Sequence, residues 1–287
     1  MNSAASPLSL SVRIAEGFLS KEQAMMDLPS LARLAHEAGY RALCMRGSQL
    51  NVWTDRGVVA AAASVLRETG LGVTMVTGDF DIVYNNDNGP RCLRGIGPYL
   101  DLATALGASM VRVALRKEED IAHARRAADE AAERGIRLVH QCHIQSLFEK
   151  VDGIVATLRA IDRPNFGLIY EAANLELCGQ DYGEETVRRL SPWIFNVYLQ
   201  NHRLHADGRV SLETWTRGAV RFDVIPISEP GGIDFGRVFD ALAATGYAGP
   251  ITVHQSAPES GSALEAARNT AGFLLGHCRR VGLAVGR

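Results

Sequence analysis

Five glycines divide the chain into repeating units of a helix followed by a strand. Each follows an amphipathic stretch and precedes a short apolar run; the five are Gly39, Gly70, Gly107, Gly135 and Gly246. Glycine readily adopts the left-handed conformation that ends a helix, which a β-carbon disfavours in other residues. Successive spacings are 31, 37 and 28 residues, and then 111, which is three times 37. Units of this length match one strand with one crossover helix, so the pattern predicts a parallel sheet covered by helices.

Three further apolar runs bring the number of units to eight. Strands are expected near 8–13, 166–170 and 194–199 in addition to the runs that follow the glycines. Eight units in 287 residues fit a closed (β/α)8 TIM barrel of about 250 residues plus loops. The alternative is an open, doubly wound sheet, but no GxGxxG motif follows the first strand. We therefore expect an α/β fold with a single barrel domain over 1–287.

Local signals place the first helix and one long loop. Ser20 and Gln23 have the spacing of a capping box, which predicts that the first helix begins there. Segment 200–232 is long for a loop in a compact barrel, and such loops usually carry function or form an interface. Trp53 and Trp215 lie in long loops at the same end of the barrel, where a role in a lid is plausible.

Composition excludes several classes of protein. The net charge of -2 and the pI of about 6.5 give no basic surface for nucleic acid and no polybasic membrane patch. No apolar run approaches the roughly 20 residues that span a bilayer, and the first residues lack the pattern of a secretory signal. Five cysteines without paired spacing suggest reduced thiols. We therefore expect a cytoplasmic protein that acts on a small molecule.

Polar side chains follow the apolar runs again and again. Arg46 follows one run, and Glu171 and Asn174 follow another. Further groups after later runs are His143, Gln200, His202, Arg203 and His254. Because parallel strands of a barrel end at the same face, groups more than 200 residues apart in sequence would meet in one pocket. This convergence indicates an enzyme.

Four segments resemble the xylose-isomerase-like TIM barrels, which include sugar phosphate isomerases and epimerases. The segments are AGYRALCMRG (38–47), DLATALGASMVRV (101–113), AAERGIRLVHQCH (131–143) and PGGIDFGRVFDALAATGYAGPITV (230–253). The resemblance covers nearly the whole chain and implies a barrel with one divalent metal near the ends of its later strands. It specifies the fold better than the reaction, because many chemistries share this scaffold.

The chain departs from the metal ligands of that family, which are commonly two glutamates, an aspartate and a histidine. Gln141 stands at the first glutamate, Glu171 at the aspartate and His254 at the last glutamate, while Tyr198 stands at the histidine with His202 four residues later. The resemblance implies that Gln141, Glu171, His202 and His254 hold one ion, and imidazole favours Mn, Co, Zn or Fe. The other interpretation is that the metal site has been lost and these groups only hydrogen-bond the substrate.

The candidate catalytic groups are His254, Glu171 and His143. An imidazole can accept or donate a proton near neutral pH, so His254 is the first candidate for the general base; if it binds metal, His143 or Glu171 takes that role. The candidate substrate-binding groups are Arg46, Asn174, Tyr198, Gln200 and Arg203. An arginine fork suits a carboxylate, a phosphate or the oxygens of a polyol.

These features predict a metal-assisted isomerase or epimerase that moves a proton on a sugar or keto-sugar through an enediolate. A lyase or dehydratase on the same scaffold is the first alternative, because both family glutamates that usually carry protons are replaced. A non-catalytic sugar-binding subunit without the metal is the second alternative. An abasic-site endonuclease would need a multi-metal cluster and a basic groove, neither of which is visible. Relatives are often dimers or tetramers, so a homo-oligomer is expected.

Overall fold

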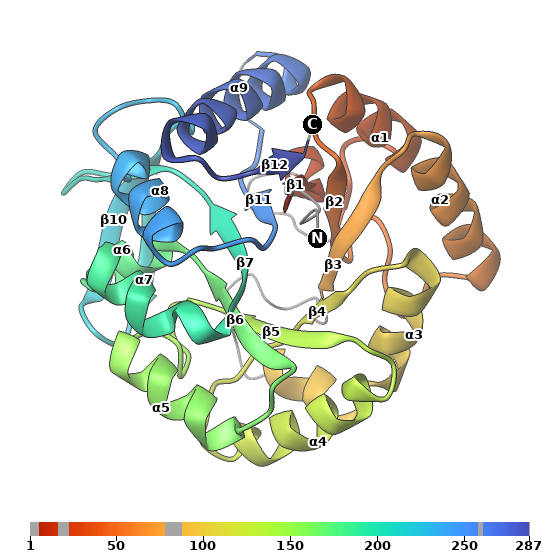
Figure 1. Ribbon diagram of the computed structural model, residues 1–287, viewed down its shortest axis with the longest axis horizontal. Helices are drawn as coiled ribbons and strands as arrows, with labels where there is room; N and C mark the ends of the chain where they lie inside the picture. The colour runs from red at the N-terminus through yellow and green to blue at the C-terminus, as the bar shows by residue number, and fades with distance from the viewer. Residues whose placement is uncertain (1–5, 17–22, 78–87, 258–260, 287) are drawn as a thin grey trace.

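A closed ring of parallel strands forms the centre of the molecule. The computed structural model describes residues 6–16, 23–77, 88–257 and 261–286. Within them, β1 to β7 and β11 pair with their neighbours in chain order, and β11 returns to pair with β1, so the barrel is closed (Figure 1). The helices surround this ring on its outer side (Figure 1). The predicted (β/α)8 barrel is confirmed.

The barrel strands are short. Their bounds are β1 Ser6–Ser11, β2 Ala42–Met45, β3 Gly72–Thr77, β4 Met110–Arg112, β5 Arg137–Gln141, β6 Phe166–Tyr170, β7 Ile194–Leu199 and β11 Ile251–Val253. A two-residue strand, β12 (Val285–Gly286), adds to β1. The strands expected near 8–13, 166–170 and 194–199 are all present.

The helices alternate with these strands along the chain. Their bounds are α1 Leu28–Glu37, α2 Arg56–Glu68, α3 Gly97–Leu106, α4 Asp120–Ala132, α5 Val151–Ile161, α6 Ala172–Leu177, α7 Glu184–Leu190, α8 Phe235–Ala244 and α9 Ala263–Val281. Three 3₁₀ turns are η1 Val12–Ala15, η2 Gly89–Arg94 and η3 Ser191–Trp193. Among the described residues, no helix has the length and apolarity needed to cross a membrane.

The helix ends follow the glycine pattern, but the first helix begins later than the capping box predicts. Gly39, Gly70, Gly107, Gly135 and Gly246 all have positive φ, as expected for residues that end helices. Ser20 lies outside the described residues, and Gln23 precedes the helix. Helix α1 begins at Leu28, and Asp27 caps it by accepting a hydrogen bond from the Ser30 backbone N–H at 2.8 Å. Asp27 with Pro29 in the first turn is the stronger start signal.

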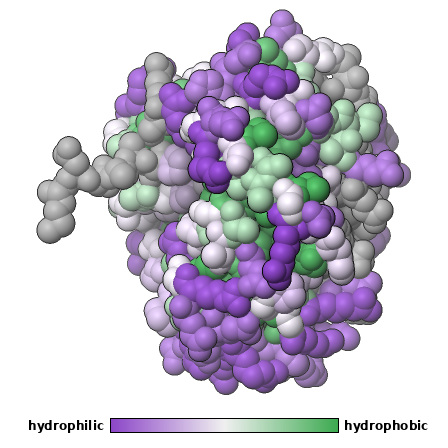
Figure 2. Space-filling view, turned by 90° about the vertical axis from the view of Figure 1, so that its right-hand side faces the viewer, coloured by the Kyte–Doolittle hydropathy of each residue, from purple (hydrophilic) through white to green (hydrophobic). Residues whose placement is uncertain are grey.

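The outer surface contrasts with the interior. Figure 2 shows the side that carries α2 and α3, where hydrophilic residues predominate and hydrophobic ones appear between them. Inside the ring, six side chains from successive strands form one buried layer: Cys44, Met75, Met110, Val139, Ile169 and Tyr198. This layer fixes which residues point inward at every level above it, because side chains on a strand alternate between the two faces.

Segment 200–232 contains an antiparallel sheet where a long loop was expected. Its strands are β8 His202–Leu204, β9 Val210–Thr214 and β10 Gly218–Val224, in the order β8-β10-β9. Val220 and Phe222 of β10 pack against Ile144, Leu177 and Cys178. The sheet therefore rests on the end of the barrel at which β5, β6 and β7 finish.

Candidate functional site

A polar layer lies directly above the apolar layer of the barrel. Two residues after each inward-facing apolar side chain comes an inward-facing polar one: Arg46 after Cys44, Thr77 after Met75, Arg112 after Met110, Gln141 after Val139, Glu171 after Ile169 and Gln200 after Tyr198. All six lie at the carboxyl ends of strands, where TIM barrels carry their active sites. The period of two residues along a strand thus brings six separate segments together.

Glu171 is the centre of this layer. Its carboxylate is fully buried and accepts hydrogen bonds from three side-chain amides, those of Gln141, Asn174 and Gln200. Asn174 also donates to the Cys142 carbonyl oxygen at 2.8 Å, which fixes the direction of its amide. Burial raises the pKa of Glu171, although the amide donors and two arginines oppose the shift. A carboxylate with a raised pKa in a polar pocket is suited to accept and return a proton.

Three arginines line the same end of the barrel as Glu171, and two of them, Arg13 and Arg112, act on its charge. Arg46 is 5 % exposed, and its Nε donates to Glu16 at 2.9 Å and 3.1 Å. Arg13 donates to Gln200 Oε1 at 2.8 Å and to the His254 carbonyl oxygen at 3.3 Å. Burial, with Arg46 nearby, lowers the pKa of Arg13 to about 10, so it stays charged at neutral pH. Arg112 is 2 % exposed and its Nε has no hydrogen-bond partner among the described residues.

His254 closes the ring of polar groups after β11. Its Nδ1 lies 3.1 Å from Ser11 Oγ, and its ring stacks on Tyr198 with 4.1 Å between ring centroids. These two contacts fix the plane of the imidazole at the wall of the pocket. A ring fixed in this way can exchange a proton with a ligand in one defined direction.

His143 and His202 border the same pocket from the side of β5 and β8. His143 Nδ1 lies 2.9 Å from the Ile144 carbonyl oxygen. A carbonyl oxygen only accepts, so Nδ1 carries the proton and Nε2 is the basic nitrogen of neutral His143. His202 Nε2 pairs with Glu176 at 2.9 Å. The Ile144 carbonyl oxygen therefore fixes the ring of His143, and the Glu176 carboxylate holds that of His202.

These groups line a cavity of about 280 Å³ beneath the antiparallel sheet. Its polar lining includes Arg13, Arg46, Arg112, Gln141, His143 and His254, and Glu171 lies behind the amides of Gln141 and Gln200. Leu212, Phe222 and Val224 come from the antiparallel sheet and cover the cavity with apolar surface. Their presence limits access of water and strengthens electrostatic interactions inside.

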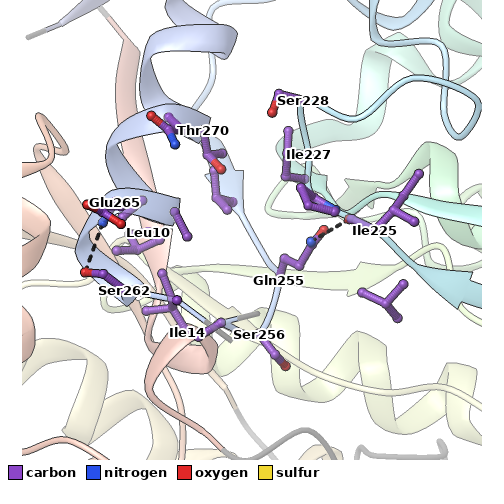
Figure 3. A pocket seen from close by; sticks show the side chains of 18 of the residues that line it. Leu10, Ile14, Ile225, Ile227, Ser228, Gln255, Ser256, Ser262, Glu265 and Thr270 are labelled. Atoms are coloured by element: carbon purple, nitrogen blue, oxygen red, sulfur yellow. Dashed lines mark hydrogen bonds between the residues drawn. The ribbon is translucent and has the colours of Figure 1, made fainter. Parts of the chain in front are cut away.

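A second, larger cavity of about 630 Å³ adjoins the first and shares Arg209, Val210 and Val224 with it. Figure 3 shows Leu10, Ile14, Ile225 and Ile227 around it, between the beginning of α9 and the end of β10. Gln255 reaches across from the end of β11 and donates to the Ile225 carbonyl oxygen at 2.8 Å (Figure 3). Only two of the described residues that line this cavity, Arg209 and Glu265, carry ionic charge, so the candidate catalytic groups are concentrated in the smaller cavity.

The structure brings together most of the residues predicted from sequence. Arg46, Asn174 and Gln200 border the small cavity as expected, together with the predicted histidines. Tyr198 lies one layer deeper, fully buried, with its hydroxyl 3.1 Å from Cys44 Sγ. Arg203 lies outside the cavity lining and pairs with Glu229 at 2.9 Å, because it follows His202 and so faces the opposite side of β8.

Two functional candidates were missed in the sequence. Arg13 follows the first strand and Arg112 ends the fourth, and both border the small cavity. The available signal was an arginine within an apolar run, since Arg112 stands between Val111 and Val113. A charged residue in such a run is almost never buried without a partner, and so deserves inspection as a ligand-binding group.

The donor set of this layer does not fit a divalent cation. The family resemblance implies Gln141, Glu171, His202 and His254 as ligands. Both oxygens of Glu171 instead accept amide N–H bonds, and His202 faces Glu176. Among the described residues, no three His, Cys, Asp or Glu side chains form a group that could hold a metal ion. The three guanidinium groups already supply positive charge here and would repel a dication.

Removal of metal is therefore expected to leave the protein unchanged. Purified protein should contain well under one equivalent of Mn, Co, Zn or Fe by plasma mass spectrometry, and EDTA should not shift its melting temperature. The Glu171→Ala variant serves as the comparison. One equivalent of metal in the wild type that is lost in Glu171→Ala would contradict this interpretation of the donor set.

Comparison with known proteins agrees with this architecture. A 129-residue stretch is 29% identical to an inosose dehydratase of Geobacillus thermodenitrificans (strain NG80-2); the match covers 45% of this chain and 43% of that protein, less than half of either. A xylose isomerase-like TIM barrel protein from Mycobacterium smegmatis, in complex with magnesium, superposes with a TM-score of 0.72 at 15% identity, over 96% of this chain and 97% of that chain.

An epimerase has the same fold. The D-allulose 3-epimerase from Methylomonas sp. superposes with a TM-score of 0.69 at 16% identity, over 95% of this chain and 98% of that chain. At such identities the superpositions establish the fold alone, and the structural neighbours include epimerases and a probable dehydratase. The sequence model described as "Xylose isomerase-like TIM barrel" matches residues 32–275. This chain belongs to the xylose isomerase-like TIM barrel family.

Proposed function

We propose that this protein is an isomerase or epimerase that moves a proton on a carbon of a sugar or keto-sugar derivative. The observation that carries the proposal is the arrangement around Glu171. A buried carboxylate is held by three amides at the carboxyl end of the barrel, and these amides line a cavity that also contains oriented histidines and three arginines. Proton abstraction next to a carbonyl needs a positioned base and positive charge near the developing oxyanion, and this layer supplies both.

The residues divide the chemistry between them. Glu171 or His143 Nε2 removes a proton from a carbon next to a carbonyl, and the C–H electron pair moves to the carbonyl oxygen to form an enediolate. The arginines stabilise the negative charge on that oxygen. His254 exchanges protons with the substrate oxygens from the opposite wall. Return of the proton to the neighbouring carbon gives the isomer, and return to the other face of the same carbon gives the epimer.

A dehydratase is the second candidate, and the match to an inosose dehydratase favours it. The first step is the same proton abstraction. The enediolate then expels a β-hydroxyl group, which leaves as water after His254 gives it a proton. The cavity contains the acid and the base for this outcome as well, so the fate of the enediolate distinguishes the two reactions.

The common first step gives a direct test. The protein is incubated in D₂O with a panel of ketoses, aldoses, inososes and sugar acids, and ¹H NMR follows loss of the C–H signal next to the carbonyl or carboxylate. Exchange with a new isomer supports the proposal, whereas exchange with an unsaturated or deoxy-keto product supports the dehydratase. Binding of a sugar without exchange in any member of the panel would contradict both and favour a non-catalytic binding subunit.

A further inference from the structure

We infer that Arg13, Arg46 and Arg112 form a subsite for an oxyanion, so that the substrate is an acidic sugar derivative that carries a carboxylate or a phosphate. This inference deepens the proposed function by naming the class of substrate that the same cavity takes. Arg46 borders the cavity with the two candidates that the sequence did not reveal.

Arg112 is the strongest part of the argument. Its side chain comes from the end of β4 inside the barrel, is 2 % exposed and lines the cavity. It makes no ion pair or hydrogen bond with the described residues, and its Nε is buried without a partner. Burial lowers the pKa of Arg112, with Arg46 contributing to the shift. Burying a charged group without a partner is costly, so such a group indicates a ligand that supplies the partner.

The other two arginines line the same cavity and keep N–H donors that no described residue engages. Arg46 uses Nε for Glu16, and Ser48 Oγ donates to the same carboxylate at 2.6 Å, so Glu16 fixes the guanidinium without engaging its terminal nitrogens. Arg13 uses one terminal nitrogen for Gln200 and the His254 carbonyl oxygen, and its Nε is buried without a partner among the described residues. Guanidinium donors arranged in this way suit the paired oxygens of a carboxylate or phosphate.

The balance of charges around the cavity also favours an anionic ligand. Three guanidinium groups face two carboxylates, Glu16 and Glu171, so these groups keep a net positive charge even when both carboxylates are ionised. Arg46 lies close enough to Arg13 and to Arg112 to lower the pKa of each, which means that the arginines repel one another. A bound oxyanion would offset this repulsion. A neutral sugar would leave it uncompensated, and so the cavity discriminates against neutral sugars.

The position of the subsite says where the charge lies on the substrate. Arg13 and Glu171 are joined through a single side chain, Gln200, which accepts from Arg13 and donates to Glu171. The oxyanion therefore lies beside the group that moves the proton, within a cavity of about 280 Å³. A carboxylate next to the reacting carbon fits this position better than a phosphate at the far end of a sugar chain. The arginines then also stabilise the charge that forms on that carboxylate when the proton leaves.

Binding measurements test the subsite independently of catalysis. Isothermal titration calorimetry uses D-gluconate as the carboxylate probe, D-fructose 6-phosphate as the phosphate probe and D-fructose as the neutral probe. We expect D-gluconate to bind at least about tenfold more tightly than D-fructose, and Arg112→Met to weaken it by at least about tenfold, as for loss of hydrogen bonds to a charged group. Arg163→Met removes a partly buried arginine that pairs with Asp129 outside the cavity lining, and this variant should bind like the wild type.

Each outcome has one meaning. If D-fructose 6-phosphate binds more tightly than D-gluconate, and Arg112→Met loses this binding, the subsite is retained and assigned to a sugar phosphate. Equal binding of charged and neutral probes, or binding that Arg112→Met leaves unchanged, overturns the inference; circular dichroism establishes that the variant is folded. Anion binding without C–H exchange on any substrate retains the subsite and removes the proposed function. C–H exchange on neutral sugars, with no tighter binding of the anionic probes, retains the proposed function and removes the subsite.

Discussion

Replacing Glu171 with glutamine is expected to lower kcat about a thousandfold, within the range that a general acid or base contributes. The variant keeps the shape of the side chain but cannot accept a proton from carbon. KM should stay the same or fall, because loss of the negative charge of Glu171 removes a repulsion toward an anionic substrate. Deuterium exchange at the substrate carbon, measured by ¹H NMR, gives the rate directly.

Glu149→Gln is the matched control for this variant. Glu149 is also a buried carboxylate, 3 % exposed, but it lies outside the cavity lining and accepts a hydrogen bond from the Trp215 backbone N–H at 2.7 Å. Glu149→Gln should keep kcat within about threefold of the wild type, as expected where no proton-transferring group is changed. Equal losses in the two variants would mean that Glu171 acts through folding rather than through proton transfer.

The pH profile follows from the environment of Glu171. Burial raises its pKa, so the carboxylate accepts its proton at a higher pH than an exposed glutamate does. The base must be ionised to act, and therefore kcat/KM should rise with pH through a pKa above the ordinary value of 4.5. The acid limb should disappear in Glu171→Gln. An acid limb at the ordinary carboxylate pKa, or one that persists in the variant, would assign proton abstraction to another group.

Replacing Arg112 with methionine is expected to stabilise the fold while it weakens the binding of an anionic substrate. The guanidinium is 2 % exposed and has no partner among the described residues, so folding carries its desolvation cost without a compensating ion pair. Methionine fills a similar volume without that cost and should raise the free energy of unfolding by about 1–3 kcal/mol. This corresponds to a melting temperature higher by several degrees, at roughly 2–4 °C per kcal/mol.

Arg46→Met should have the opposite effect. Arg46 is buried to a similar degree, but it is paired with Glu16, which is itself 5 % exposed. Its removal leaves a buried carboxylate without its cation, which costs about 3–5 kcal/mol. Urea unfolding and thermal unfolding of both variants measure the contrast. A loss of stability in Arg112→Met as large as that in Arg46→Met would show that Arg112 is held by interactions within the fold rather than kept for a ligand.

The sequence determined the barrel because its evidence is local and repeated. Helix ends at Gly39, Gly70 and Gly107 depend on the conformational freedom of glycine, which needs no knowledge of the rest of the chain. The same holds for the apolar runs that became strands. The start of α1 was missed because two cap signals compete there, and Asp27 with Pro29 prevails over Ser20 and Gln23. The sheet within 200–232 was missed because its strands are only partly buried, so their apolar pattern is weaker than that of the barrel strands.

The sequence also identified the level of the site, since polar groups after buried strands must gather at one end of a barrel. Gln141, Glu171 and His254, which follow three separate strands in the sequence, lie at this end of the barrel; Gln141 and His254 line the cavity, and Gln141 donates to Glu171. What the tertiary structure alone decided is the partner of each group. The amides bind Glu171, and Arg46 binds Glu16, which stands 30 residues earlier in the chain.

The direction in which each side chain points, and its height in the barrel, explain why the sequence gives the level of the site but not the partners. Tyr198 and Gln200 point the same way, yet one belongs to the apolar layer and the other to the polar layer, because they stand two residues apart along one strand. Which residues of other strands share their layers depends on the stagger between strands. Arg112 stands inside an apolar run and meets Arg13 and Arg46 only when the ring closes. Residue type and spacing along one strand are written in the sequence, whereas the register between strands, and with it the balance of charge in the pocket, exists only in the folded barrel.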